Sequence, residues 1–334
     1  MKAIVFEGAE HLSVKDVPMP SVQEGGTLIR IAYAGICGSD MTIYCGKHPR
    51  ARAPLVLGHE FSGYIASKNP SLPEGSLVTV YPYMYCGTCE ICESGRQNAC
   101  PSVRLIGIDR DGGMAEYVSV PNDGIFPAPP GISPKLAAFI EPCGISVHAM
   151  IRGGYRPGDS VAIFGAGPIG LAVAITLRAN GAKDMILIEP NESRLMIAKK
   201  LGFKAVAAGP DALGHIRDAT GGQGADCIFD CAGHQSAIDV IPDAVKCGGS
   251  VVLVAGYKNP PAMDFQKGMM REFTIRFVRN CNRRDFRIAA ELVARFAAEY
   301  ETLLSDTLTI DEAQKGFDLM SSPGKSMKIM FAIS

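Results

Sequence analysis

The sequence predicts two domains, one mainly β and one α/β with a parallel sheet. With 334 residues, the chain is longer than the ~250–300 residues at which a single core usually stops growing. In residues 1–145, short Val/Ile-rich runs alternate with Gly/Pro turns, which favours a small barrel or sandwich. After residue 145, apolar strands alternate with helical stretches, which indicates βαβ units. A last strand is expected in residues 327–333.

Two further stretches are expected to be continuous helices. Residues 135–152 are apolar with few helix breakers, and residues 285–299 are amphipathic.

Composition indicates a globular enzyme and argues against several kinds of partner. The hydrophobic fraction is 47%, the charged fraction is 20% and the net charge is −1, so bulk charge favours neither nucleic acid nor an anionic membrane. The longest apolar run, residues 161–177, is broken by glycines and a proline, whereas a membrane span needs ~20 apolar residues. The N-terminal residues lack a signal-peptide pattern. We therefore expect a cytoplasmic protein.

A glycine fingerprint follows the first strand of the α/β region. In VAIFGAGPIG, Gly165 allows a tight turn, Gly167 lets the backbone approach a pyrophosphate, and Gly170 permits close packing of helix on sheet. The helix that follows offers free N–H groups to phosphates. Glu189 ends the next strand, where an acid can bind a ribose 2′-hydroxyl and repel a 2′-phosphate, which favours NAD over NADP. The turn residues expected to contact the dinucleotide are Gly165, Gly167, Pro168, Ile169 and Gly170. The alternative is a glycine-rich turn without a ligand.

Four clustered cysteines are spaced C-x2-C-x2-C-x7-C. They are Cys86, Cys89, Cys92 and Cys100. One loop with this spacing can wrap a cation with four thiolates, which suits a structural tetrahedral zinc without an open position. An iron–sulfur cluster is the rival, but the corresponding ferredoxin motif has three residues, not seven, before its fourth cysteine. Free thiols are the remaining alternative. The odd total of eleven cysteines argues against a secreted disulfide framework.

Three other segments carry residues that can bind a metal. GICGSD contains Cys37, Ser39 and Asp40, GHEFSG contains His59 and Glu60, and IEPCG contains Glu141. A catalytic zinc takes about three protein ligands and leaves a position for water or substrate, and a thiolate, an imidazole and a carboxylate can supply them. The alternatives are a buried cysteine, a hydrogen-bonded core histidine and an acid at a helix N-terminus.

The order GICGSD, GHEFSG, four-cysteine loop, GAGPIG resembles that of the zinc-containing medium-chain dehydrogenase/reductase family, over essentially the whole chain. The dipeptide Glu141-Pro142 resembles the polyol branch, which includes sorbitol, butanediol, threonine and galactitol-phosphate dehydrogenases. Liver-type alcohol dehydrogenases carry a zinc-binding cysteine at the position aligned with Glu141, and Cys143 could be mistaken for that ligand. Glu141 is the better match because His148 follows it as in the polyol branch.

The resemblance implies an α/β Rossmann domain plus a mainly-β GroES-like catalytic domain. Residues 1–145, completed by 280–334, would form the catalytic domain, and residues 146–279 would form the inserted NAD-binding domain, with the active site in the cleft. The family forms homodimers and homotetramers, often by pairing Rossmann sheet edges, and SVVLVAGY, residues 250–257, could serve as that edge.

The resemblance also implies roles for single residues. Cys37 and His59 would bind a catalytic zinc directly. Glu60 and Glu141 would share the remaining position, one directly and one directly or through water. Ser39 would relay the proton of the alcohol. The further residues implied at the cofactor are Arg194, Val254 and Arg279.

Two departures from the polyol branch bear on the substrate. Many of these enzymes continue the first motif as CGSD-x-H, whereas Met41-Thr42 follows here, so that histidine is absent. VRNCN, residues 278–282, resembles a sorbitol-dehydrogenase segment, in which Arg279 matches an active-site arginine and Asn280 replaces a tyrosine, which argues against sorbitol itself. The residues aligned with the family's substrate pocket are Tyr44, Ile108, Asp109, Arg279 and Asn280.

A basic loop, KHPRAR in residues 47–52, follows the first metal motif. It could bind a phosphate or carboxylate of the substrate. The alternative is a solvated surface loop.

These features predict an oxidoreductase with two zinc ions per chain. It would transfer hydride from a secondary alcohol of a polyol or sugar alcohol to NAD, giving a ketone, and the basic loop would admit phosphorylated or acidic substrates. The catalytic zinc would act as a Lewis acid. One alternative is a threonine-type amino-alcohol dehydrogenase. Another is a zinc-free quinone-type reductase, which the retained Cys37, His59 and Glu141 disfavour. A third is a non-catalytic zinc- and NAD-binding protein.

Overall fold

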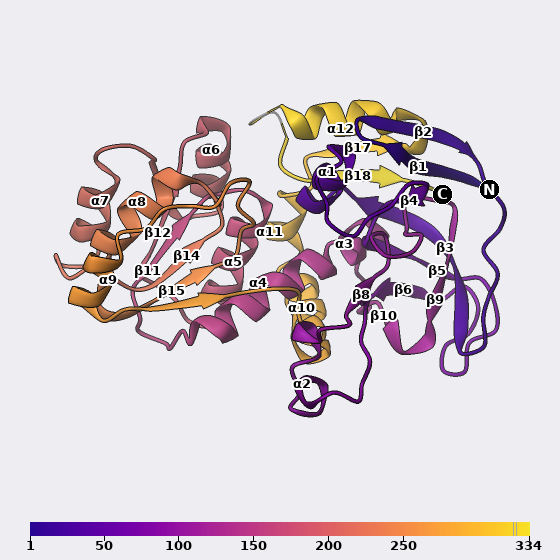
Figure 1. Ribbon diagram of the computed structural model, residues 1–334, viewed down its shortest axis with the longest axis horizontal. Helices are drawn as coiled ribbons and strands as arrows, with labels where there is room; N and C mark the ends of the chain where they lie inside the picture. The colour runs from indigo at the N-terminus through magenta and orange to yellow at the C-terminus, as the bar shows by residue number, and fades with distance from the viewer. Residues whose placement is uncertain (323, 325) are drawn as a thin grey trace. The chain divides into compact units, whose positions relative to one another are not determined.

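The computed structural model describes residues 1–322, 324 and 326–334. The chain divides into two compact units, Met1–Gly144 with Asn282–Ser334, and Ile145–Cys281. Both chain ends therefore belong to the first unit (Figure 1). Among the described residues, no helix is long and apolar enough to cross a lipid bilayer.

Mostly antiparallel strands form the first unit, as the sequence of residues 1–145 predicts. The smaller sheet has the order β2-β1-β4, the larger has the order β10-β6-β5-β3-β18-β17 with β9 paired to β3, and β7 pairs with β8. The strands are β1 (Lys2–Gly8), β2 (His11–Asp16), β3 (Gly26–Gly35), β4 (Leu55–Val56), β5 (Glu60–Ile65), β6 (Leu77–Val80), β7 (Tyr83–Met84), β8 (Arg104–Leu105), β9 (Tyr117–Pro121), β10 (Ile125–Pro127), β17 (Asp306–Thr309) and β18 (Ile329–Ala332).

Strand β18 carries the C-terminal end of the chain into the N-terminal sheet. It pairs antiparallel with β3, where Phe331 lies opposite Ala34, and both side chains are fully buried. Short helices connect and cover the strands. They are α1 (Gly38–Tyr44), α2 (Glu90–Glu93), η1 (Gln97–Ala99), η2 (Asn122–Gly124), α3 (Pro134–Ala138), α10 (Arg283–Arg295), α11 (Ala297–Glu301), η3 (Ile310–Glu312) and α12 (Ala313–Ser321).

The second unit is a doubly wound α/β domain. Its parallel sheet has the order β13-β12-β11-β14-β15-β16, so the strand order reverses between β11 and β14. Ligands of such sheets bind at the carboxyl ends of the strands at this point. Helix α4 (Ile140–Gly153) begins in the first unit, which includes Gly144, and continues into the second. The other elements are β11 (Val161–Phe164), α5 (Pro168–Ala179), β12 (Met185–Glu189), α6 (Glu192–Lys200), β13 (Lys204–Ala207), α7 (Ala212–Ala219), β14 (Ala225–Asp230), α8 (Gln235–Ala244), β15 (Val245–Leu253), α9 (Phe265–Arg271) and β16 (Thr274–Phe277).

Both stretches predicted to be helical are helical, but each is divided into two helices. The stretch 135–152 breaks at Phe139 into α3 and α4. Because proline lacks an N–H, Pro142 is best accommodated in the first turn of a helix, and the break places it there. The stretch 285–299 likewise breaks at Phe296 into α10 and α11.

The prediction that residues 250–257 form an edge of the sheet was wrong. Residues 250–253 belong to β15, which has β14 on one side and β16 on the other. Strand β16, which the sequence did not predict, lies at that edge of the sheet. Its sequence contains Arg276, and Thr274 and Phe277 at its two ends are exposed, so it lacks the buried apolar run of a central parallel strand.

Candidate active site

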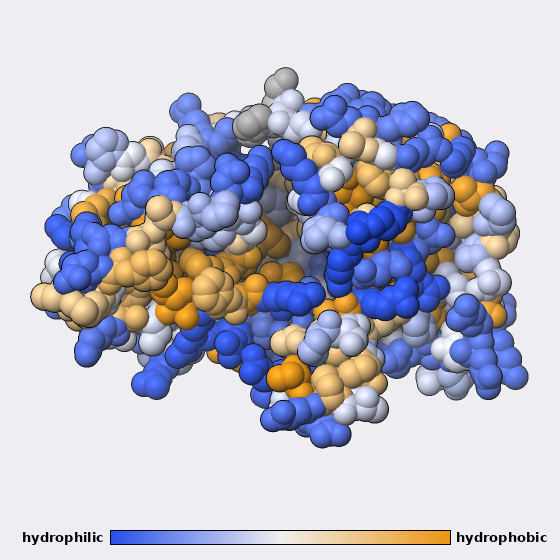
Figure 2. Space-filling view, in the orientation of Figure 1, coloured by the Kyte–Doolittle hydropathy of each residue, from blue (hydrophilic) through white to orange (hydrophobic). Residues whose placement is uncertain are grey.

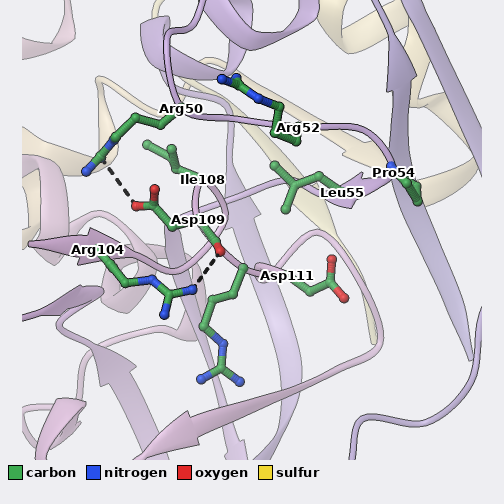
Figure 3. A pocket seen from close by; sticks show the side chains of 9 residues that line it. Arg50, Arg52, Pro54, Leu55, Arg104, Ile108, Asp109 and Asp111 are labelled. Carbon is green, nitrogen blue, oxygen red and sulfur yellow. Dashed lines mark hydrogen bonds and ion pairs between the residues drawn. The ribbon is translucent and has the colours of Figure 1, made fainter.

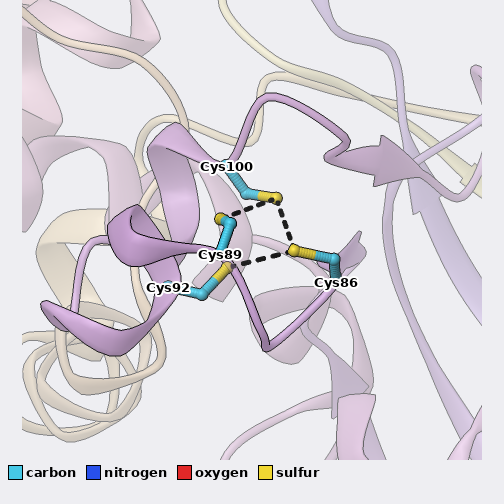
Figure 4. A group of neighbouring side chains, drawn as sticks. All are labelled: Cys86, Cys89, Cys92 and Cys100. Atoms are coloured by element: carbon cyan, nitrogen blue, oxygen red, sulfur yellow. Dashed lines mark hydrogen bonds between the residues drawn. The ribbon is translucent and has the colours of Figure 1, made fainter.

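The four-cysteine loop closes on itself. The Sγ atoms of Cys86, Cys89, Cys92 and Cys100 all lie within 4.8 Å of one another (Figure 4). The Cys86–Cys100 and Cys86–Cys92 sulfur distances are 3.6 Å and 3.9 Å. A tetrahedron with metal–sulfur bonds of ~2.3 Å has edges of about 3.8 Å, so the four thiols fit zinc. Backbone N–H groups of Thr88 and Cys89 lower the pKa of Cys86 to about 6, which favours the thiolate that a metal requires.

A second group of metal donors forms where α1 approaches β5. Cys37, His59 and Glu60 each offer one donor atom within 4.8 Å of the others. Cys37 precedes the first turn of α1, and its N–H donates to the Asp40 carboxylate at 2.8 Å. Glu60 begins β5 opposite Gly35 on β3. Pairing of β3 with β5 therefore brings together residues that are more than twenty positions apart.

These donors have the chemistry and burial of a zinc site. His59 and Glu60 are only 4% and 2% exposed. Burial lowers the pKa of His59, but Cys37 and Asp40 outweigh it, so this pKa lies well above its ordinary value. The Nδ1 atom of His59 and Oδ1 of Asp40, 3.8 Å apart, have no hydrogen-bond partner among the described residues. A half-buried thiol, a buried imidazole and a buried carboxylate are groups that can bind Zn²⁺.

Glu141 stands outside this group of three donors. It lies in the first turn of α4, is buried, and accepts a hydrogen bond from the Tyr83 hydroxyl. Burial raises the pKa of Glu141 to about 7, and His59 acts in the opposite direction. Cys143 does not join either; its thiol donates to Tyr300 Oη at 3.2 Å. Between Glu60 and Glu141, the geometry brings Glu60 alone into the group.

Lys328 is a functional residue that the sequence reasoning missed. It is 5% exposed, its Nζ forms an ion pair with the Glu60 carboxylate, and it donates to the Ile36 carbonyl at 2.8 Å. Burial lowers the pKa of Lys328, but Glu60 and Cys37 more than compensate, so the pKa is raised. A Cβ at Gly35 would lie 2.6 Å from Glu60 Oε2, so the pair needs glycine there. The sequence feature that could have pointed to Lys328 is its position as a lone lysine just before an apolar terminal strand.

The proposed proton-relay residue lies beside the metal donors. Ser39 Oγ is 3.4 Å from His59 Nε2. The Thr42 hydroxyl, in contrast, donates to the Gly38 carbonyl within α1 at 3.1 Å. Thr42 is thus already engaged and is a poor replacement for the missing histidine.

The glycine fingerprint has the geometry of a phosphate-binding turn. Gly165 has φ +94°, and a Cβ at Gly170 would lie 1.9 Å from the Gly165 carbonyl oxygen, so both positions require glycine. Gly167 caps α5, and Pro168 and Ile169 form its first turn. The Glu189 carboxylate accepts hydrogen bonds from the Ala166 and Asn191 N–H groups at 2.7 and 3.0 Å. Glu189 therefore stabilises the turn. Since each of its oxygens has a second lone pair, it can still accept a hydrogen bond from a ribose hydroxyl.

The other expected cofactor residues also lie in the second unit. Arg194 on α6 lies beside Gly167, since a Cβ built there would be 3.6 Å from its Nη1. Val254 follows β15, at the carboxyl end of the sheet. Arg279 and Asn280 follow β16, and Asn280 has a left-handed φ of +57°.

The residues of the first unit that were predicted to contact the substrate do not lie in one pocket. Tyr44 packs on α12, with its ring centroid 5.3 Å from that of Phe317 and its hydroxyl accepting from Gln314 at 3.1 Å. Ile108 and Asp109 line a pocket of about 410 Å³ that does not include Tyr44.

The comparisons with known proteins agree with the fold and with a zinc-binding dehydrogenase. Residues 23–130 match the alcohol dehydrogenase GroES-like domain, and residues 168–295 match the zinc-binding dehydrogenase domain. L-Threonine 3-dehydrogenase of Bacillus velezensis is 32% identical, over 96% of this chain and 95% of its own. L-Galactonate-5-dehydrogenase of Escherichia coli is 36% identical, over 88% and 87%.

A solved structure has the same fold across its full length. The 2R,3R-butanediol dehydrogenase of Bacillus subtilis has a TM-score of 0.91 at 25% identity, with 99% of each chain covered. The chain therefore belongs to the zinc-containing medium-chain alcohol dehydrogenase family and is a zinc-dependent dehydrogenase of the polyol and threonine type that uses a nicotinamide dinucleotide.

Proposed function

We propose that this enzyme oxidises a secondary alcohol of a polyol or sugar alcohol to a ketone and passes the hydride to NAD. The observation that carries the proposal is the group of half-buried Cys37 with buried His59 and Glu60, which would supply the three protein ligands of a catalytic zinc. Zinc bound there would polarise the substrate oxygen and lower the proton affinity of the hydroxyl. The similarity to L-galactonate-5-dehydrogenase supports a polyhydroxylated substrate.

The two acids of the proposed zinc site have different constraints. Cys37 and His59 would hold the metal, while the ion pair with Lys328 restrains Glu60 and the hydrogen bond from Tyr83 restrains Glu141. In this proposal Glu60 completes the ligand set while its Oε2 stays paired with Lys328, whereas Glu141 could approach the metal only by leaving Tyr83. In this proposal the first unit carries the catalytic residues, and the second unit binds NAD through the glycine turn.

L-Threonine is the second candidate substrate, because an L-threonine 3-dehydrogenase matches 96% of the chain. Initial rates of NADH formation with hexitols, hexitol phosphates, aldonates and L-threonine separate the two. Preference for L-threonine would replace the polyol proposal. Absence of zinc-dependent NADH formation from the whole panel would contradict both.

A Ser39→Ala variant is expected to lose kcat by about 10²-fold or more at neutral pH, the usual contribution of a positioned acid–base group. The Ser39 hydroxyl lies 3.4 Å from His59 Nε2 and would take up the proton of the alcohol. Thr42→Ala is the matched control, because its hydroxyl is already bonded to Gly38. Metal analysis should find zinc unchanged in both variants, and undiminished turnover of Ser39→Ala would contradict the relay.

We expect the enzyme to prefer NAD to NADP by at least about tenfold in kcat/KM. The Glu189 carboxylate, fixed by two backbone N–H groups, would repel a 2′-phosphate. Glu189→Gln removes the charge and should reduce this ratio. Equal use of NAD and NADP by the unmodified enzyme would show that Glu189 does not discriminate between them.

We further propose a homodimer that pairs through the β16 edge. Phe265, Met269 and Met270 on α9 and Phe277 on β16 are 77%, 63%, 72% and 73% exposed. Figure 2 shows hydrophobic surface over α9. Within the described part of the chain, β16 has β15 as its only strand neighbour, and an apolar open edge invites pairing with a second copy. A homotetramer would need a further interface.

A Phe277→Asp variant is expected to halve the molar mass measured by light scattering, because it places a charge within the proposed interface. Met196→Asp, at an exposed position on α6, is the control and should leave the mass unchanged. A monomeric unmodified protein, or a dimer that survives Phe277→Asp, would exclude this edge.

A further inference from the structure

A pocket of about 410 Å³ in the first unit is lined mainly by charged side chains (Figure 3). The charged residues in its wall are Arg50, Arg52, Arg104, Arg110, Asp109 and Asp111. Arg50 and Arg52 come from the basic loop before β4, whereas the other four come from β8 and the segment after it. Two parts of the chain that are fifty residues apart thus build one basic pocket.

The carboxylates of the pocket do not neutralise its arginines. Four guanidinium groups face two carboxylates, a difference of two positive charges. Asp109 Oδ2 pairs with Arg50 Nη2 at 3.3 Å and accepts the Leu105 N–H at 2.7 Å. Asp111 Oδ1 accepts the Val56 N–H at 2.9 Å. Both acids thus hold the walls in place, and the excess positive charge remains.

Three of the arginines keep most of their N–H groups available. Arg52 donates to the Ala51 carbonyl at 2.9 Å, Arg104 to the Asp109 carbonyl at 3.2 Å, and Arg110 to the Ser119 carbonyl at 3.1 Å. These are the bonds of their guanidinium groups among the described residues, and an arginine has five N–H donors. Planar guanidinium groups with free donors match the paired oxygens of a carboxylate or phosphate.

The pocket adjoins the segment that leads to the metal donors. Strand β4 forms part of its wall, and the chain then runs through Gly58 to His59, so the Cα atoms of Leu55 and His59 are at most about 14 Å apart. The segment after Asp111 is bonded to the same stretch, with Gly113 N–H donating to the Gly58 carbonyl at 2.9 Å.

His48, in the basic loop, reflects the same proximity. The pKa of His48 is lowered from its ordinary value. Burial is the largest cause, and the nearby charges that act on it are Arg50, Asp109, His59 and Arg52, of which only Asp109 raises the pKa. His48 is therefore within electrostatic reach of both the pocket and the metal donors.

We propose that this pocket binds a carboxylate or phosphate at the end of the substrate remote from the oxidised carbon. The inference rests on the proposed function and narrows its substrate class to anionic polyols. An anion held there would position the chain of the substrate along the segment that leads to His59. Arg52 is the arginine to test, because it is exposed and its guanidinium group donates to the adjacent carbonyl.

The test compares kcat/KM for galactitol, L-galactonate and galactitol 1-phosphate in the zinc-loaded enzyme and in Arg52→Gln. Relative to galactitol, the anionic substrates should lose about tenfold or more in the variant, the effect of losing one charge-assisted hydrogen bond. Arg287→Gln, on the exposed face of α10, is the control and should leave the ratios unchanged. The two anionic arms show whether carboxylate or phosphate is preferred.

Failure of this inference is distinguishable from failure of the proposed function. If galactitol and the anions are oxidised equally well, or if Arg52→Gln and Arg52→Gln/Arg104→Gln leave the ratios unchanged, the pocket does not bind substrate. If no polyol is oxidised, calorimetric titration with L-galactonate and galactitol 1-phosphate decides. Binding that Arg52→Gln weakens supports the anion site, and absence of binding overturns it.

Discussion

A Cys37→Ala variant is expected to lose one of two zinc ions per chain and to fall in kcat/KM by about 10³-fold or more. Cys37 supplies the thiol of the three donors gathered within 4.8 Å, and thiolate is a preferred zinc ligand. Without the Lewis acid, the activation free energy should rise by several kcal/mol, which corresponds to a rate factor of this order. Metal analysis and steady-state kinetics measure the two effects.

Two further cysteine variants separate the roles of the zinc sites. Cys92→Ala should also lose one zinc, but its main effect should be a lower melting temperature, because a metal bound by the four thiols would hold the 86–100 loop closed. Cys45→Ala, at an exposed cysteine outside both groups, should retain two zinc ions and full activity. If Cys37→Ala keeps two zinc ions, or keeps its activity after losing one, the assignment of the catalytic site is wrong.

A Lys328→Met variant is expected to lower stability by about 3–5 kcal/mol, because it leaves the Glu60 carboxylate buried without its counter-charge. In a unit of this size, that loss corresponds to a fall in melting temperature on the order of 10 °C, measured by differential scanning calorimetry. Lys315→Met is the control: its ion pair with Glu312 is exposed, so its loss should change stability by less than about 1 kcal/mol.

The double variant Glu60→Gln/Lys328→Met tests the reason for that effect. It removes both charges together, so much of the lost stability should return, as replacement of whole buried ion pairs often shows. If Lys328→Met alone has the melting temperature of the unmodified enzyme, or if the double variant is no more stable than Lys328→Met, the ion pair does not account for the burial of these groups.

The sequence could predict the site features that are built within one short segment. The four cysteines are held by one loop, so their spacing limits which metal geometry they can form, and the structure brings their sulfur atoms together. The glycine turn is likewise local: Gly165 and Gly170 are required by the backbone of the turn itself. The two-domain organisation and the parallel sheet were predicted from the hydrophobic pattern along the chain, although the strand pairs themselves join distant residues.

Features that depend on contacts distant in sequence were not predictable in this way. The break of residues 135–152 at Phe139 is different, because its signal was local: Pro142 is best accommodated in the first turn of a helix, here α4. The outer strand β16 was missed because an edge position removes the apolar run that marks a central strand. The sequence of the basic loop did not indicate that the segment carrying Asp109 and Asp111 forms the other wall of the pocket.

The hydrophobic pattern of the sequence thus predicted the fold class, and spacing within two short segments predicted the four-cysteine group and the glycine turn. Only the tertiary structure decided that Glu60 rather than Glu141 joins Cys37 and His59. It also decided that Lys328 neutralises Glu60 from the far end of the chain, through the pairing of β18 with β3. The physical reason is burial: the charge state and position of a buried group depend on its partners in space, and these partners lie far away in sequence.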